Sequence, residues 1–189
     1  MRVYLTGFMG CGKSTVGRRL ASRLDMPFVD TDDWIEKQIG MRIPEYFAEA
    51  GEAAFREQER NALEATAAHP HAVVATGGGM LVDEARMQRA KELGTVVYLQ
   101  VDVDTLYKRL APEAASRPLL WDDDGTPLQG TALRRHIADL LAWRAPAYER
   151  AHLQVDATDR PERVSATIAA HVQTQKEKPE EGQDADKDR

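Results

Sequence analysis

Short apolar runs alternate with helical patterns along most of the chain. Val3 to Leu5 is the first run, and the glycine-rich turn after it leads into Lys13–Leu24, where apolar residues recur at helical spacing. Runs without polar alternation, each separated from the next by a helix, are typical of parallel strands buried on both faces. The pattern predicts the α/β class: a three-layer α/β/α fold with a central five-stranded parallel sheet and ligands at the carboxyl ends of its strands. The other predicted strands are Pro27–Asp30, Ala72–Ala75, Thr95–Val101 and Leu153–Val155.

Two segments interrupt this alternation. Residues 111–130 contain prolines, glycines and three consecutive acids, which predict a long surface loop able to close over a site as a lid. After His171 the chain is polar and mixed in charge, and such a segment buries too little surface to order itself. We therefore expect one domain over residues 1–172, with the lid at about 111–130, and a disordered polar tail over residues 173–189.

Composition narrows the function classes. The chain has 189 residues, 42% hydrophobic and 30% charged, which fits one globular domain, and no apolar run reaches the ~18 residues that span a bilayer. The start, MRVYLTGFMG, lacks the pattern of a secretory signal, so we expect a cytoplasmic protein without a membrane partner, and a monomer. The single cysteine, Cys11, excludes an internal disulfide, and no His/Cys cluster has zinc-ligand spacing. A formal charge of −6 argues against a nucleic-acid partner.

The segment GFMGCGKS, from Gly7 to Ser14, fits the G-x-x-x-x-G-K-[ST] pattern of a phosphate-binding loop and lies between a predicted strand and a predicted helix. Glycines let backbone N–H groups point at phosphates, and the helix that begins near Lys13 presents its positive end there. The alternative is a plain glycine-rich turn, whereas the order G-x-x-G-x-G excludes a dinucleotide fingerprint. Cys11 is either a small filler or a redox group. The expected nucleotide contacts in the loop are Gly10, Cys11, Gly12, Lys13, Ser14 and Thr15.

Carboxylates follow the second predicted strand, next to the phosphate-binding loop. Magnesium prefers oxygen ligands, and in proteins with such loops an acid at a strand end shares the cation with the loop serine, so Asp30 is the expected partner of Ser14. Asp32 can orient an acceptor hydroxyl and take its proton during phosphoryl transfer. In the alternative interpretation, Asp32 or Asp33 only caps a helix over Trp34–Ile39.

Arginines and a glycine triplet complete the candidate site. Arg56 lies three residues before Glu59, which could hold its guanidinium, and Gly77–Gly79 ends a buried strand where bare backbone can approach a ligand. Arg144 ends a helical stretch just before Pro146, and Arg117 lies in the lid. Each arginine alone could be an ordinary solvated surface residue.

The order of these motifs is specific. They are GFMGCGKST at Gly7–Thr15, DTD at Asp30–Asp32, GEAAFRxxE at Gly51–Glu59, GGG at Gly77–Gly79, RPLL at Arg117–Leu120 and RAPAY at Arg144–Tyr148. Over residues 1–171 the sequence resembles the shikimate kinase family of P-loop kinases. The resemblance implies ATP-dependent phosphorylation of the 3-hydroxyl of shikimate with Mg²⁺, in the pathway to chorismate and aromatic amino acids.

The resemblance also implies roles for single residues. Lys13, Asp32 and Arg117 would be catalytic: Asp32 would contact the shikimate hydroxyls as the base, and Arg117 would close onto the ATP phosphates. Two arginines, Arg56 and Arg144, would bind the substrate carboxylate, because a guanidinium pairs bidentately with a carboxylate. The other implied contacts are Phe47, Phe55, Gly77, Gly78 and Gly79 for shikimate, and Arg109 and Arg160 for the adenine side of ATP.

The sequence departs from the family pattern in the lid. The acidic insert Trp121–Asp124 would repel ATP if it folded inward, so we expect it to face solvent. Two other functions stay open: a kinase of the same fold with gluconate or a nucleoside monophosphate as acceptor, and a non-catalytic nucleotide switch whose arginines dock an acidic partner. The switch is disfavoured because the chain has no N-K-x-D guanine signature.

Overall fold

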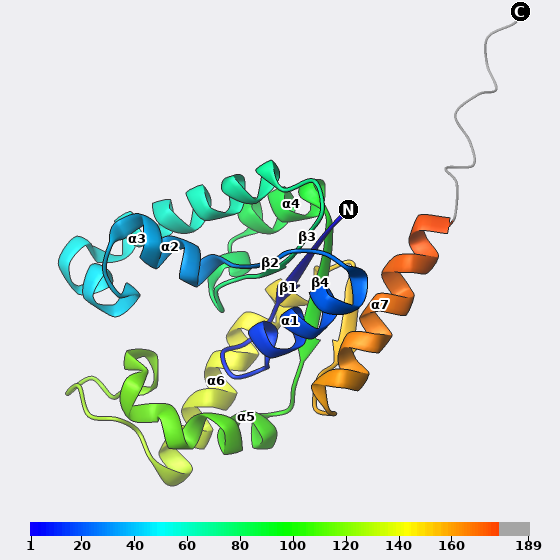
Figure 1. Cartoon of the computed structure of the whole chain (residues 1–189). Helices are drawn as coiled ribbons and strands as arrows, with labels where there is room; N and C mark the ends of the chain where they lie inside the picture. The colour runs from blue at the N-terminus through cyan, green and yellow to red at the C-terminus, as the bar shows by residue number, and fades with distance from the viewer. Residues whose placement is uncertain (178–189) are drawn as a thin grey trace, which may run out of the picture.

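The computed structural model describes residues 1–177 and is built around a five-stranded parallel sheet of order β2-β3-β1-β4-β5 (Figure 1). The central strand β1 places Tyr4 beside Val74 of β3 on one side and beside Val96 of β4 on the other. Each predicted strand is present, to within one residue at either end, and the α/β class is confirmed. The strands are β1 (Arg2–Thr6), β2 (Phe28–Asp30), β3 (Ala72–Ala75), β4 (Thr95–Gln100) and β5 (Leu153–Asp156).

Helices connect the strands and cover both faces of the sheet (Figure 1). Within residues 1–177, none of them is long and apolar enough to cross a membrane. The α-helices are α1 (Lys13–Leu24), α2 (Thr31–Ile39), α3 (Ile43–Ala65), α4 (Glu84–Leu93), α5 (Val103–Leu110), α6 (Gly130–Tyr148) and α7 (Pro161–Glu177). The 3-10 helices are η1 (Thr66–Ala68), η2 (Met80–Val82), η3 (Ala111–Ser116) and η4 (Pro118–Leu120).

Two hydrophobic layers lie on opposite faces of the sheet because neighbouring strand residues point in opposite directions. Val3 and Leu5 of β1 pack with apolar residues of α1, α5, α6 and α7. Tyr4, between them, packs with apolar residues of α2, α3 and α4. Both faces of the strands are therefore buried, which explains why their sequences are continuous apolar runs rather than alternating ones.

Three predicted boundaries are wrong. Helix α2 begins at Thr31 rather than Trp34, because the carboxylate of Asp30 accepts from the Asp32 backbone N–H and caps the helix earlier. Helix α6 continues through Pro146 to Tyr148, so Arg144 lies inside the helix. Helix α7 extends to Glu177, so residues 173–177, assigned to the disordered tail, are helical. The rest of that predicted tail, 178–189, lies outside the described residues.

The lid is more ordered than a loop prediction implies. It contains η3 and η4, followed by a tight reversal in which Trp121 forms an isolated antiparallel bridge with Pro127. The Asp122 carboxylate accepts from the backbone N–H groups of Asp124 and Thr126, at 3.1 and 2.8 Å. Asp122, Asp123 and Asp124 are exposed, as expected for the acidic insert. Trp121 was expected to face solvent with them but is half-buried, because its indole N–H donates to the carbonyl oxygen of Ala114 at 3.0 Å.

Candidate active site

Strand order brings the predicted motifs to one edge of the sheet. β1 is followed by the phosphate-binding loop, β2 by the acids and β3 by the glycine triplet, and β2, β3 and β1 are neighbours. In a parallel sheet the carboxyl ends of adjacent strands lie together. Three segments far apart in sequence therefore form one surface, as predicted.

The phosphate-binding loop runs from Gly7 to the first turn of α1. Gly12, which caps α1, has a φ of 97°, a conformation that favours glycine. The Lys13 ammonium folds back and donates to the carbonyl oxygens of Gly7 and Phe8, at 2.9 and 3.0 Å. The predicted nucleotide contacts are thus contiguous in the loop and the start of α1: Gly10, Cys11, Gly12, Lys13, Ser14 and Thr15.

One further predicted residue, Arg109, lies against this loop, and Cys11 lies within it. Arg109 of α5 donates to the carbonyl oxygens of Gly10 and Cys11, at 3.2 and 3.3 Å, and to that of Ala157, at 3.3 Å. It therefore joins the loop to the segment after β5. Cys11 is 1% exposed and packs in the hydrophobic core, which fits the filler interpretation.

Ser14 and Asp30 face each other across the gap between α1 and β2. The Ser14 hydroxyl donates to Asp30 Oδ2 at 2.7 Å, and Asp30 Oδ1 accepts from the Asp32 N–H at 3.1 Å. Among residues 1–177, no group of three or more His, Cys, Asp or Glu residues could hold a metal ion. A hydroxyl and a carboxylate in contact nevertheless suit Mg²⁺, which takes few protein ligands and is completed by phosphates and water.

The carboxyl group of Asp32 is unusually easy to protonate. Burial raises its pKa to about 6, and the negative charge of Asp30 adds to the effect, while the charge of Lys13 opposes it. The backbone of Gly77 lies against this group: a Cβ on Gly77 would be 2.7 Å from Asp32 Oδ1. A side chain at position 77 would therefore displace the Asp32 carboxyl group.

Two arginines converge on the third glycine of the triplet. A Cβ on Gly79 would lie 3.4 Å from Arg56 Nη1 and 3.9 Å from Arg144 Nη2. Arg56 Nη1 also donates to Glu59 Oε2 at 2.8 Å, and the Glu59 side chain is almost fully buried. The predicted arginine pair and the predicted Arg56–Glu59 contact are both present.

Arg144 is buried, and its Nε is a buried donor that finds no hydrogen-bond partner among residues 1–177. Its guanidinium carbon lies 5.9 Å from the centroid of the Phe8 ring. The fully buried Tyr148, one turn later on α6, donates from its hydroxyl to the carbonyl oxygen of Gly78 at 2.5 Å. A buried guanidinium with an unused donor is suited to binding an anion.

Aromatic rings border the arginines. Phe47 and Phe55 of α3 meet edge to face, with ring centroids 5.7 Å apart. Phe55 is buried, whereas Phe47 is 41% exposed, and the Arg56 guanidinium lies 5.6 Å from the centroid of Phe55. Helix α3 is kinked at Gly51, between the two rings.

Two predicted site residues are held apart from this cluster. In the lid, Arg117 pairs with Glu113, whose Oε2 accepts from Nε at 3.1 Å and from Nη2 at 2.5 Å. Arg160 is exposed just before α7, and its backbone N–H donates to Asp159. Both would need to move, or a ligand would need to reach them, for the predicted contacts with ATP.

Sequence reasoning missed one contributor to this cluster, Tyr148, and the burial of another, Glu59. Glu59 was expected to pair with Arg56, but the sequence does not show that its side chain is almost fully buried. A glutamate is rarely buried without a positive partner. Tyr148 closes the RAPAY motif, but nothing in the sequence alone shows that its hydroxyl reaches the glycine triplet. Its pKa is raised by burial and, to a lesser degree, lowered by the nearby charge of Arg144.

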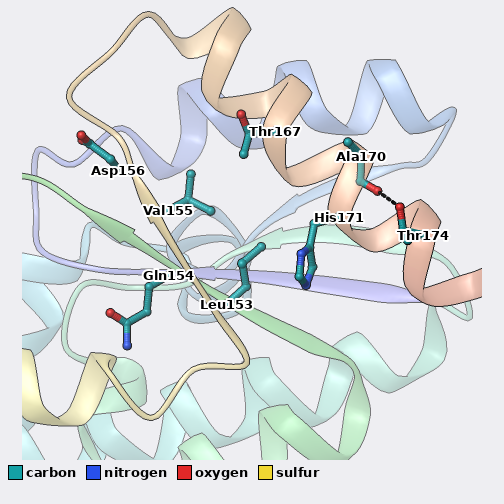
Figure 2. A pocket seen from close by; sticks show the side chains of 8 residues that line it. All are labelled: Leu153, Gln154, Val155, Asp156, Thr167, Ala170, His171 and Thr174. Carbon is teal, nitrogen blue, oxygen red and sulfur yellow. Dashed lines mark hydrogen bonds between the residues drawn. The ribbon is translucent and has the colours of Figure 1, made fainter.

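A separate hollow lies at the far edge of the sheet. It has a volume of about 560 Å³ and lies between β5 and α7, where Leu153, Val155, Thr167 and Thr174 are among its lining residues (Figure 2). None of the lining residues is a predicted site residue. The clustered groups at the carboxyl edge of the sheet therefore remain the candidate active site, whatever the size of this hollow.

In a fold of this kind, a nucleotide held by the glycine loop presents its terminal phosphate to the acids that follow the neighbouring strand. Beside those acids, Arg56 and Arg144 can pair with a negatively charged group on a second, small molecule. The fold and the site together define a P-loop kinase for a small anionic acceptor.

Comparisons with known proteins narrow this class. The family model described as shikimate kinase matches residues 9–174. The shikimate kinase of Salinibacter ruber is 51% identical over 178 residues, 94% of this chain and 87% of the relative. The shikimate kinase of Chlorobium chlorochromatii is 43% identical over 166 residues, 88% of this chain and 86% of the relative. The chain belongs to the shikimate kinase family.

A solved structure agrees. Shikimate kinase from Acinetobacter baumannii, in complex with shikimate, superposes with a TM-score of 0.81 at 33% sequence identity. The match covers 94% of this chain and 95% of that one. The three-layer P-loop kinase fold predicted from the sequence is therefore confirmed.

Proposed function

We propose that this protein transfers the γ-phosphoryl group of ATP to the 3-hydroxyl of shikimate, which gives shikimate 3-phosphate and ADP on the pathway to chorismate. Membership of the shikimate kinase family supports the reaction. The structural observation that supports the proposal most directly is that Arg56 and Arg144 converge on Gly79, close to Asp32 and the phosphate-binding loop. Such a pair matches an acceptor with a carboxylate on one side and hydroxyls on the other.

On the acceptor side, the two guanidinium groups bind the carboxylate of shikimate, and the backbone of Gly77, Gly78 and Gly79 lines the ring. Phe47 and Phe55 cover its apolar face. This orientation directs the ring hydroxyls toward Asp32, which positions the attacking oxygen and accepts its proton as the new P–O bond forms. The gluconate and nucleoside monophosphate alternatives are disfavoured by the identity to shikimate kinases.

On the nucleotide side, the loop N–H groups of Gly10, Cys11 and Gly12 and the start of α1 hold the phosphates, with Thr15 beside them. Lys13 moves from the carbonyl oxygens of Gly7 and Phe8 to the β- and γ-phosphates. Ser14 and Asp30 are the proposed protein ligands of Mg²⁺. When bound, the cation neutralises charge on the phosphates.

The outer contacts follow the same proposal. Arg109 and Arg160 border the adenine side, and Arg117 leaves Glu113 to reach the phosphates when the lid closes and excludes water. The expectations of a single domain over residues 1–172, a cytoplasmic monomer, and no nucleic-acid or membrane partner stay predictions.

ADP release tests the function directly. The protein is incubated with ATP and Mg²⁺ together with shikimate, gluconate or a nucleoside monophosphate in separate reactions. We expect rapid ADP release with shikimate only, and a product phosphorylated at the 3-hydroxyl by ³¹P NMR. Turnover of another acceptor in preference to shikimate would overturn the proposal.

Two variants connect that activity to the proposed site. Lys13→Ala removes a charge that the transition state needs, so activity should fall by a factor corresponding to about 3–5 kcal/mol. Arg144→Ala should raise the KM for shikimate and leave the KM for ATP nearly unchanged. Unchanged shikimate kinetics in Arg144→Ala would refute the assigned carboxylate site.

A further inference from the structure

Arg86 on α4 has no role in the reaction proposed above, yet its side chain is only 11% exposed. Its Nε donates to the carbonyl oxygen of Met80 at 2.7 Å, immediately after the glycine triplet. Its Nη2 lies 3.7 Å from Oε2 of Glu59 on α3. Arginines are rarely this buried unless they are paired. Arg86 therefore joins α4 to two elements of the acceptor site.

The Glu59 carboxylate connects Arg86 to that site. Its Oε2 is shared, because Arg56 Nη1 donates to the same oxygen at 2.8 Å. Its Oε1 faces the glycine triplet, where a Cβ on Gly77 would lie 3.5 Å away. With only 2% of its side chain exposed, Glu59 has little water to stabilise its charge.

Charge balance shows what Arg86 adds. Arg56 and Glu59 by themselves form a neutral pair, so a substrate carboxylate arriving at Arg56 would also meet the negative charge of Glu59. Arg86 supplies a second positive charge, and the three groups together carry a net charge of one positive unit. Each arginine has one more acidic partner: Glu52 pairs with Arg56, and Asp83 lies 4.0 Å from Arg86 Nε. These carboxylates are 66% and 45% exposed, so water screens their charges.

We propose that Arg86 is a positioning residue for acceptor binding. It offsets Glu59 and anchors the turn at Met80, so that Arg56 keeps its charge and its orientation for the substrate carboxylate. This inference rests on the proposed function, because it assumes that the carboxylate of shikimate binds at Arg56.

The test compares Arg86→Met with Arg89→Met, a matched control on the same helix. Arg89 forms exposed ion pairs with Glu64 and Glu92 and touches none of the acceptor-site residues named above. In Arg86→Met we expect the KM for shikimate to rise about tenfold or more, with the KM for ATP within about twofold of wild type. Arg89→Met should match wild type in both constants.

Two further variants separate positioning from simple support of the fold. Arg86→Lys keeps the charge but not the fork of donors, so it should recover part of the lost affinity. In a Glu59→Gln background, Arg86→Met should raise the KM for shikimate much less than in wild type, because Arg86 acts through Glu59. If Arg86 only supported the fold, its substitution would weaken the binding of both substrates. Its effect on the KM for shikimate would then add independently to that of Glu59→Gln.

Each outcome of these measurements either supports or contradicts the proposed role of Arg86. A folded Arg86→Met protein with an unchanged KM for shikimate, or strictly additive effects with Glu59→Gln, would overturn the inference. If Arg86→Met does not fold by circular dichroism, Arg86→Lys and Arg86→Gln are judged by the same split between the two KM values. Wild-type protein without shikimate turnover would overturn the proposed function instead, whereas active wild type with insensitive Arg86 variants overturns only the role of Arg86.

Discussion

Asp32 carries a carboxyl group whose protonation depends on burial. Burial first and the charge of Asp30 second raise its pKa to about 6. A cation at Ser14 and Asp30 would lower this pKa, because a nearby positive charge favours the carboxylate. We therefore predict that the Asp32 carboxyl titrates near pH 6 by ¹³C NMR in EDTA, and at lower pH with Mg²⁺ and nucleotide. A value near 4 in EDTA would contradict the burial described here.

The same shift predicts a stability effect. A carboxyl group whose pKa is raised on folding favours the folded state at low pH and costs stability once it ionises. In metal-free buffer at pH 8, Asp32→Asn should therefore increase the free energy of unfolding by about 2 kcal/mol while activity is lost. The gain should shrink as the pH falls from 6 toward 4. Urea denaturation at several pH values measures it, and a less stable variant at pH 8 would refute the prediction.

At the scale of elements, Arg2 ties the start of β1 to the ends of two helices. Its guanidinium donates to the carbonyl oxygens of Thr66, Ala67 and His69, after α3, and to that of Leu93 at the end of α4, at 2.6–3.2 Å. The Thr66 carbonyl also accepts from the His69 backbone N–H, at the end of η1. A cation near the carbonyl groups at the end of a helix is favourable.

We predict that Arg2→Met lowers the free energy of unfolding by about 2 kcal/mol without changing either KM, because charge-assisted hydrogen bonds are lost far from the active site. Thermal denaturation and steady-state kinetics measure the two effects. Arg19→Met, which removes an ion pair with Glu162 exposed at both ends, is the control and should cost at most about 0.5 kcal/mol. Equal losses in the two variants would count against the capping role.

The lid gives a second prediction at this scale. If Arg117 leaves Glu113 to stabilise the transferring phosphoryl group, Arg117→Ala should lower kcat about 100-fold and change the KM for shikimate little. Arg135→Ala, on the exposed face of α6, is the control and should retain the wild-type kcat. A full kcat in Arg117→Ala would show that the lid arginine has no catalytic part.

The elements also show what the sequence can and cannot predict. The five strands and the phosphate-binding loop were predictable because their signals are local: continuous apolar runs, and glycines at fixed spacing before Lys13. The start of α2 was not, because Asp30, Asp32 and Asp33 are all good caps and only the backbone geometry selects Asp30. Nor was the continuation of α6 past Pro146, because a proline usually ends a helix and packing of Tyr148 in the core overrides that preference.

For the whole molecule, the site residues could be predicted because they belong to sequence motifs. The contacts that hold these residues in position could not be predicted. Asp32, Arg56 and Arg144 stand out in the sequence, but the contacts of Glu59, Arg86 and Tyr148 with the glycine triplet and its neighbours depend on how α3, α4 and α6 pack against the sheet. Contacts across long sequence separations leave no periodic signal. Such residues therefore emerge only from the folded structure.

A crystal structure of the protein with ADP, Mg²⁺ and shikimate tests the central claim most directly. We predict that the shikimate carboxylate contacts both Arg56 and Arg144, and that the 3-hydroxyl lies within hydrogen-bond distance of Asp32. That hydroxyl should also point toward the β-phosphate held at Lys13. Shikimate bound elsewhere, or with its carboxylate away from both arginines, would contradict the account.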